Sequence, residues 1–176
     1  MGKLSDLHDS ASPEKRLATM DVDGIDAAVL FGGGPLGTMN SELYIASFRA
    51  YNRWLADFCS ADRNRLSGVA YLPMRDLDES RALLREAAAL GHRTVNIPAF
   101  PQSSDGVSTS AKMGNIQMAQ GAALSGDPNS TKAYWHPEFE TLWAEIQDLD
   151  MTVTFHLGGR GKRFKKKDQL LNKMEM

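Results

Sequence analysis

Mainly apolar runs and helix-like repeats alternate along this chain. Four short runs, at 27–31, 66–72, 94–99 and 151–157, are rich in aliphatic and aromatic residues, and Gly or Pro lies at or just beyond the end of each. The first run is apolar throughout, which is typical of a strand buried on both faces of a parallel sheet. The other three predict further strands.

Helical periodicity fills the spaces between these runs. Apolar residues recur three and four positions apart within 41–59, where Tyr44, Phe48 and Leu55 fall on one face. Similar patterns predict helices at about 12–20, 76–90 and 136–149, and one more at 163–176. Strands that alternate with helices indicate an α/β fold with parallel strands. Four such units would make up half of an eightfold β/α barrel.

One stretch, 101–134, follows neither pattern. It is rich in Ser, Gly, Asn and Ala and carries few large apolar residues. A patternless stretch of this length within a compact domain is uncommon and is usually functional or disordered. We therefore expect a long loop insertion at 101–134 within a single domain that spans 1–176.

Composition and charge exclude several classes of protein. The chain of 176 residues has a net charge of −2, and its single cysteine, Cys59, permits neither an internal disulfide nor a cysteine-based zinc cluster. No apolar run is long enough to span a membrane, and no signal peptide begins the chain, so we expect a cytoplasmic protein. Residues 160–176 form a basic tail with seven basic and two acidic residues. Such a tail binds an anion or nucleic acid, or is simply a solvated surface; we favour the second reading.

Three polar residues within or just beyond the predicted strands are candidates for the site, because a barrel places its chemistry at the C-terminal ends of its strands. His156 lies near the end of the run 151–157, where an imidazole binds a divalent metal or forms hydrogen bonds within a core. Asn96 lies within the run 94–99, and Arg160 follows His156 by four residues. We predict Asn96 and Arg160 as substrate-binding residues, although a structural role fits each of them too. The triple glycine 32–34 lacks the spacing of a nucleotide-binding loop.

Three segments resemble an amidohydrolase-related family that includes aminocarboxymuconate-semialdehyde decarboxylase and the resorcylate-type decarboxylases. The first joins 16–21 to 24–30. The second contains Tyr51-Asn52, Trp54-Leu55, Arg63, LSGVAYLPM, DLDESRALLREAAALG and TVNIP, and the third runs from Pro137-Glu138-Phe139 through Leu142-Trp143 to MTVTFHLGG. The order and spacing of these motifs carry the resemblance, which covers most of the chain outside 101–134.

The resemblance implies a (β/α)8 barrel, represented here by about strands 2 to 5 with their helices. It implies one divalent metal, zinc or alternatively manganese, and decarboxylation or hydrolysis of a small carboxylic acid. His156 falls on the family's metal-binding histidine at the end of strand 5. The family's His-x-His or Glu-x-His pair and its later histidine and aspartate have no counterpart in this sequence. We therefore expect the chain as given to be incomplete as an enzyme.

A non-catalytic function is the alternative. A half barrel presents two strand edges and an apolar surface, so the chain would act through self-association or partner binding. Under either hypothesis we expect a homo-oligomer that has no membrane segment and does not bind nucleic acid.

Overall fold

A four-stranded parallel sheet forms the centre of the computed structural model, which describes residues 12–36, 40–101 and 133–155. The strands lie in chain order, so each is paired with the next. They are β1 (Ala28–Leu30), β2 (Leu66–Tyr71), β3 (Thr94–Asn96) and β4 (Thr152–Thr154). The helices are α1 (Pro13–Asp23), α2 (Ser41–Cys59), α3 (Leu77–Ala89), the short 3-10 helix η3 (Pro137–Phe139) and α5 (Glu140–Asp148). The predicted α/β alternation with parallel strands is confirmed.

Short polar side chains set the starts of the three longest helices. Ser12, Asn40 and Asp76 each accept a hydrogen bond from the backbone N–H three residues further on, at the first turn of α1, α2 and α3. These bonds satisfy N–H groups that have no partner inside the helix. The sequence prediction for 41–59 matches the bounds of α2, and α1 and α3 differ from their predictions by a few residues.

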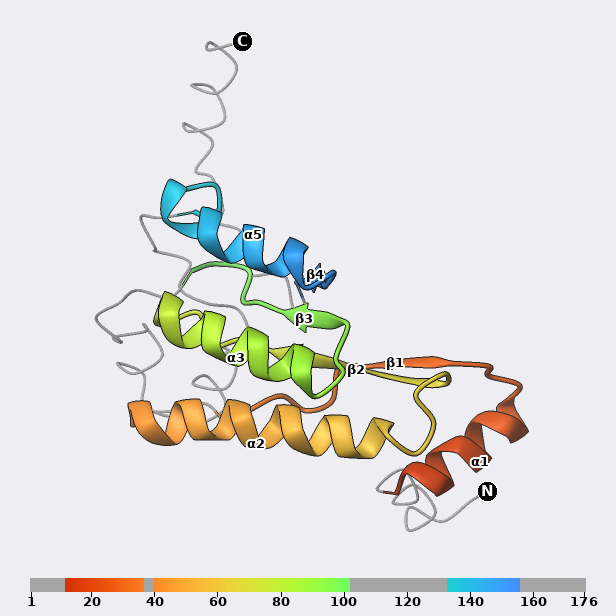
Figure 1. The fold of residues 1–176 in the computed structure, drawn as a ribbon. Coiled ribbons are helices and arrows are strands. Elements are labelled where there is room, and N and C mark those ends of the chain that lie inside the picture. The colour runs from red at the N-terminus through yellow and green to blue at the C-terminus, as the bar shows by residue number, and fades with distance from the viewer. Residues whose placement is uncertain (1–11, 37–39, 102–132, 156–176) are drawn as a thin grey trace, which may run out of the picture.

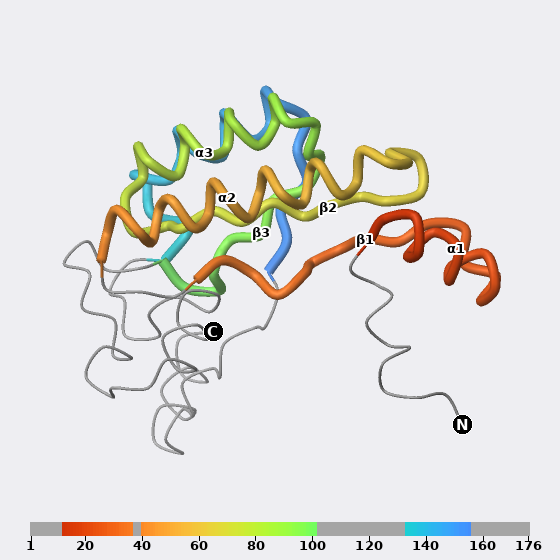
Figure 2. Tube along the Cα trace, turned by 90° about the horizontal axis from the view of Figure 1, so that it is seen from below, coloured from red at the N-terminus to blue at the C-terminus, as the bar shows by residue number. Residues whose placement is uncertain are grey.

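The helices α2, α3 and α5 cover one face of the sheet, as Figures 1 and 2 show. The main core lies between them and the strands. Its fully buried side chains include Phe48, Leu84, Val95 and Leu142. In a smaller cluster, Met20 of α1 packs with Leu55 and Leu66, and Ala28 and Leu30 of β1 pack against it. The buried thiol of Cys59 belongs to this second cluster, as expected for a small apolar side chain.

The prediction that the strand 27–31 is buried on both faces is wrong for this structure. Val29, in the middle of β1, is 60% exposed. The physical reason is its position: β1 is the edge strand of the described sheet, and the cluster of Met20, Leu55, Cys59 and Leu66 packs against Ala28 and Leu30, the neighbours of Val29 whose side chains lie on the opposite face of the strand. The apolar composition of this strand suits a complete barrel, in which the other face would be covered as well.

Two predicted segments fall largely or wholly outside the described residues. These are the loop insertion at 101–134, of which only Pro101, Ala133 and Tyr134 are described, and the basic tail at 160–176 with its predicted helix. Within the described part of the chain, none of the helices combines the length and the apolar character that crossing a membrane requires.

Candidate functional site at the C-terminal edge of the sheet

The register of the sheet divides the strand residues between two faces. Val95 of β3 pairs in register with Ala70 of β2 and Val153 of β4, and all three pack into the core beneath the helices. Side chains alternate along a strand, so the neighbouring positions lie on the opposite face, which would be the interior of a closed barrel. On β3 and β4 that inner face carries only short polar residues: Thr94, Asn96, Thr152 and Thr154.

Asn96 and Thr154 form the polar pair nearest the C-terminal edge. They are register partners, and the Thr154 hydroxyl lies 3.4 Å from Asn96 Oδ1 and 3.2 Å from the Val95 carbonyl oxygen. Asn96 is 1% exposed, and Thr154 is partly buried. An amide contributes two N–H donors and one acceptor, and a hydroxyl contributes one donor. Together they form a largely buried polar pair at the edge where barrel enzymes place their chemistry.

Three tyrosine hydroxyls hold the chain just beyond the ends of β1, β2 and β3. Tyr51 donates to the Phe31 carbonyl at 2.5 Å, and Tyr44 donates to the Pro73 carbonyl at 3.3 Å. Tyr134 donates to the Pro98 carbonyl at 2.8 Å. A backbone carbonyl just beyond the end of a strand has no hydrogen-bond partner in the neighbouring strand, and in each case the tyrosine hydroxyl takes that place. The bond therefore fixes the direction in which the following loop leaves the sheet.

Burial keeps the phenols of Tyr51, Tyr134 and Tyr71 in the protonated form that donates. It raises the pKa of Tyr51 and of Tyr134 well above the ordinary value for a tyrosine, and it raises the pKa of Tyr71, at the end of β2, to about 12. These tyrosines therefore act as hydrogen-bond donors and packing groups at neutral pH, and they do not supply a base.

Asn52 of α2 separates β1 from β2 at this edge. Its Nδ2 donates to the Tyr71 carbonyl at 3.0 Å, and its Oδ1 accepts from the Tyr71 N–H at 2.8 Å. The β1–β2 pairing ends at Leu30 and Gly68, so the side-chain amide takes the place of a neighbouring strand at Tyr71. The Tyr51 ring contacts the Tyr71 ring edge-on with their centroids 5.3 Å apart, next to this amide. The two strands consequently diverge toward their C-terminal ends.

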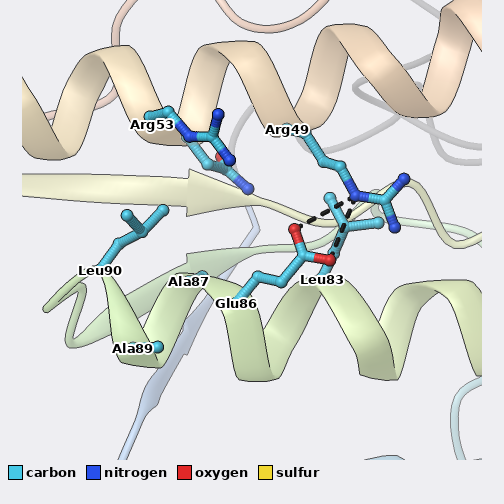
Figure 3. Close-up of a pocket in the computed structure, with 8 residues that line it drawn as sticks. Arg49, Arg53, Leu83, Glu86, Ala87, Ala89 and Leu90 are labelled. Atoms are coloured by element: carbon cyan, nitrogen blue, oxygen red, sulfur yellow. Dashed lines mark hydrogen bonds and ion pairs between the residues drawn. The ribbon is translucent and has the colours of Figure 1, made fainter.

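Two surface grooves lie on the helix side of the sheet. The first, about 260 Å³, runs between α2 and α3, where Arg49 forms an ion pair with Glu86 at 3.2 Å (Figure 3). The second, about 480 Å³, lies by the N-terminal ends of these helices, and the Arg75 guanidinium stacks over the Tyr44 ring at 3.5 Å. Its lining combines two arginines with three carboxylates, Glu42, Asp76 and Glu79. That balance gives no preference for a carboxylate ligand.

The predicted site residues are only partly described. Asn96 lies on the inner face at the C-terminal edge, whereas His156 and Arg160 lie outside the described residues. Among residues 12–36, 40–101 and 133–155, no three His, Cys, Asp or Glu side chains form a group that would hold a metal. The described part of the chain therefore does not by itself make a metal centre.

Sequence reasoning missed the hydrogen bonds that Asn52 and the three tyrosines make at the strand ends. A signal for Asn52 was present, because it stands four residues after Phe48 on the buried face of α2, where a polar residue requires a partner. The strand-end bonds of Tyr51 and Tyr134 reach residues 20 and 36 positions away, and no local pattern encodes such contacts.

Comparison with known proteins gives a structural likeness. No protein-family model matches the chain, and no curated protein matches it either. Among solved structures, it resembles 2,6-dihydroxybenzoate decarboxylase, in a complex with 2,6-dihydroxybenzoate and in a structure from Rhizobium. The TM-score is 0.61 and the identity 22% in each case, and the match covers 88% of this chain and 42% of the other.

A second relative is a dihydroxybenzoic acid decarboxylase from Polaromonas sp. JS666 with bound manganese and the inhibitor 2-nitroresorcinol. It matches with a TM-score of 0.51 and 17% identity, over 91% of this chain and 41% of that one. The chain thus spans less than half the length of the structures it resembles. Its fold is part of the TIM barrel seen in these decarboxylases, as the sequence predicted.

Proposed function

We propose that this chain is the part of a metal-dependent, decarboxylase-like barrel enzyme that includes strands 2 to 5, and that it acts on a small aromatic or unsaturated carboxylic acid. The observation that carries the proposal is the polar inner face of β3 and β4, with Asn96 and Thr154 at the C-terminal edge of a fold shared with dihydroxybenzoate decarboxylases. Fold alone does not define activity, so the proposal depends on the chemistry of this edge.

In this proposal Asn96 binds and orients the substrate. The partly buried Thr154 hydroxyl, 3.4 Å from Asn96 Oδ1, would hold this amide in place, and the amide would contact a carboxylate or phenolate oxygen of the substrate. Arg160 would pair with the substrate carboxylate, since a guanidinium binds a carboxylate through two parallel hydrogen bonds. The three tyrosine bonds at the strand ends would keep the surrounding loops in position.

His156 is the proposed metal ligand. His156 follows β4, which ends at Thr154, by two residues, and barrel enzymes place catalytic groups at the C-terminal ends of their strands. The relative that contains bound manganese supports a divalent metal, and zinc is the alternative. The other ligands would have to come from residues beyond those described, and we assign no reaction step to the metal.

Metal binding by the purified chain tests the ligand assignment. We would measure Mn²⁺ and Zn²⁺ binding by equilibrium dialysis for the wild type, His156→Ala and the control His136→Ala. His136 caps η3 with a half-exposed side chain, so its loss should leave binding unchanged. The proposal predicts that His156→Ala weakens binding at least about tenfold, since even the loss of a group that hydrogen-bonds to a metal ligand has this effect. Equal binding by all three proteins would remove His156 from the site.

A second measurement addresses the substrate. 2,6-Dihydroxybenzoate, the ligand of one structural relative, is the probe, and its binding to the wild type, Asn96→Ala and Thr94→Ala would be followed by calorimetry in the presence of Mn²⁺. Thr94 lies on the same face of β3 but at its N-terminal end, so it controls for general damage to the strand. The proposal requires a loss of affinity in Asn96→Ala alone, and equal affinities would refute the role of Asn96.

A further inference from the structure

Tyr71 lies in the same row of the sheet as Asn96, the proposed substrate-binding residue. The two pair in register, and Asn96 pairs in turn with Thr154, so these three residues end β2, β3 and β4 side by side. Ala70 packs into the core beneath the helices, and side chains alternate along a strand, so the Tyr71 side chain leaves β2 on the inner face. Neighbouring strands are about 4.8 Å apart, so one small aromatic acid could contact both Tyr71 and Asn96.

Two residues of α2 fix the position of Tyr71. The side-chain amide of Asn52 forms two hydrogen bonds with the Tyr71 backbone, at 2.8 and 3.0 Å, and the Tyr51 ring contacts the Tyr71 ring edge-on. Tyr71 belongs to the main core cluster and is 2% exposed. A side chain held in this way loses little conformational freedom when a ligand binds to it, so the entropic cost of binding is low.

The hydroxyl of Tyr71 has no hydrogen-bond partner within residues 12–36, 40–101 and 133–155, where the backbone bonds to Asn52 and the ring contact are the interactions of this residue outside the strand pairing. In the same part of the chain, Arg16 Nε is the one side-chain nitrogen or oxygen that is fully buried without a partner. The small exposed area of Tyr71 therefore includes its hydroxyl. Because a buried tyrosine hydroxyl ordinarily has a partner, this position suits an oxygen atom of a ligand.

The hydroxyl would act as a donor toward such a ligand. Burial raises the pKa of Tyr71 to about 12, so the phenol keeps its hydrogen at neutral pH. Its register neighbours on β3 and β4 are the uncharged residues Asn96 and Thr154, which do not repel an anion. A hydrogen bond to a charged oxygen is stronger than one between neutral groups, so a carboxylate or phenolate oxygen is the favoured acceptor.

We propose that Tyr71 is a further substrate-binding residue, and that its hydroxyl donates a hydrogen bond to a carboxylate or phenolate oxygen of the substrate beside Asn96. This inference rests on the proposed function, because it takes the C-terminal edge of the sheet as the substrate site. A site that hydrogen-bonds a substrate oxygen discriminates strongly against analogues that lack the oxygen, so Tyr71 contributes to specificity.

Calorimetric titration with 2,6-dihydroxybenzoate in the presence of Mn²⁺ tests this role in the wild type, Tyr71→Phe and the control Ser67→Ala. Ser67 lies four residues earlier on the same face of β2, and its replacement also removes one hydroxyl. We expect Tyr71→Phe to weaken binding at least about tenfold, as for the loss of a hydrogen bond to a charged group, and Ser67→Ala to bind like the wild type. Equal affinities of Tyr71→Phe and the wild type would overturn the role of Tyr71 and leave the proposed function standing, whereas a wild type that binds no acid would overturn both.

Urea unfolding of the same three proteins separates a substrate-binding role from a structural one. A hydroxyl without a partner in the protein does not stabilise the fold, so Tyr71→Phe should keep the unfolding equilibrium constant within about twofold of the wild type. Loss of a structural hydrogen bond would raise that constant about fivefold. A fivefold rise in Tyr71→Phe would contradict the proposal, because the hydroxyl would then have its partner within the chain.

Discussion

Replacement of Asn52 by leucine should destabilise the chain more than any exposed polar substitution. Leucine has a similar volume, so the main change is the loss of two buried hydrogen bonds to the backbone of Tyr71, at 2.8 and 3.0 Å. Both residues are almost fully buried, so water does not replace the lost partner. A buried backbone group without a partner costs about 1–3 kcal/mol, and two such groups cost about 2–6 kcal/mol. That is a large part of the stability of an ordinary domain, about 5–15 kcal/mol.

Urea denaturation followed by circular dichroism measures the effect, with Asn64→Leu as the matched control. Asn64 is exposed in the turn before β2, and its bond to Asp62 comes from its backbone N–H, which the substitution keeps. The control should stay within about 0.5 kcal/mol of the wild type. If Asn52→Leu costs less than about 1 kcal/mol, the amide does not replace a strand at Tyr71 and the account of the diverging β1 and β2 fails.

Three further predictions concern the strand ends and the helix surface. Tyr51→Phe should cost about 1 kcal/mol in urea denaturation, because it removes the hydroxyl that donates to the carbonyl just beyond β1; an unchanged midpoint would show that this bond does not stabilise the loop. Gly32→Ala should cost about 1–3 kcal/mol, since φ is 58° and an added Cβ would overlap the Tyr51 hydroxyl, whereas Gly33→Ala, which meets nothing within 4 Å, should be nearly neutral, and equal effects would contradict the geometry. Burial opposes ionisation of Glu145, but hydrogen bonds from two arginines of α3 outweigh it and lower its pKa. The wild type should therefore lose stability as pH falls below about 4.5 and through the lowered folded-state pKa, Glu145→Gln should lose less, and coinciding acid profiles would refute the pairing.

The sequence predicted the order and type of the elements well because their signals are local. Asn40 at the start of α2 and Asp76 at the start of α3 accept capping hydrogen bonds, as short polar side chains commonly do at helix N-termini, and the apolar periodicity of α2 matches its buried face. The exposure of Val29 could not be predicted, because it depends on which strands lie beside β1 and not on the composition of β1.

The candidate site was less predictable than the fold. Asn96 stood out because a polar residue interrupts an apolar strand, and the structure places it on the inner face beside Thr154. The position of the His92 ring between two backbone carbonyl oxygens could not be predicted either, because these partners lie 24 and 40 residues away in the sequence. His156 and Arg160 lie outside the described residues, so their roles stay predictions.

Paramagnetic broadening by Mn²⁺ in nitrogen-15 NMR spectra tests the central claim most directly, because it locates a metal without requiring activity. The account predicts that substoichiometric Mn²⁺ first broadens the amides at the C-terminal edge of the sheet, those of Asn96, Thr154 and Phe155, and that His156→Ala removes this pattern. The amides of Arg65 and Arg93, at the opposite edge, should remain sharp. Broadening of the amides at the N-terminal edge, or even broadening of the amides of all acidic residues in the helices, would contradict a metal-dependent site at the C-terminal ends of these strands.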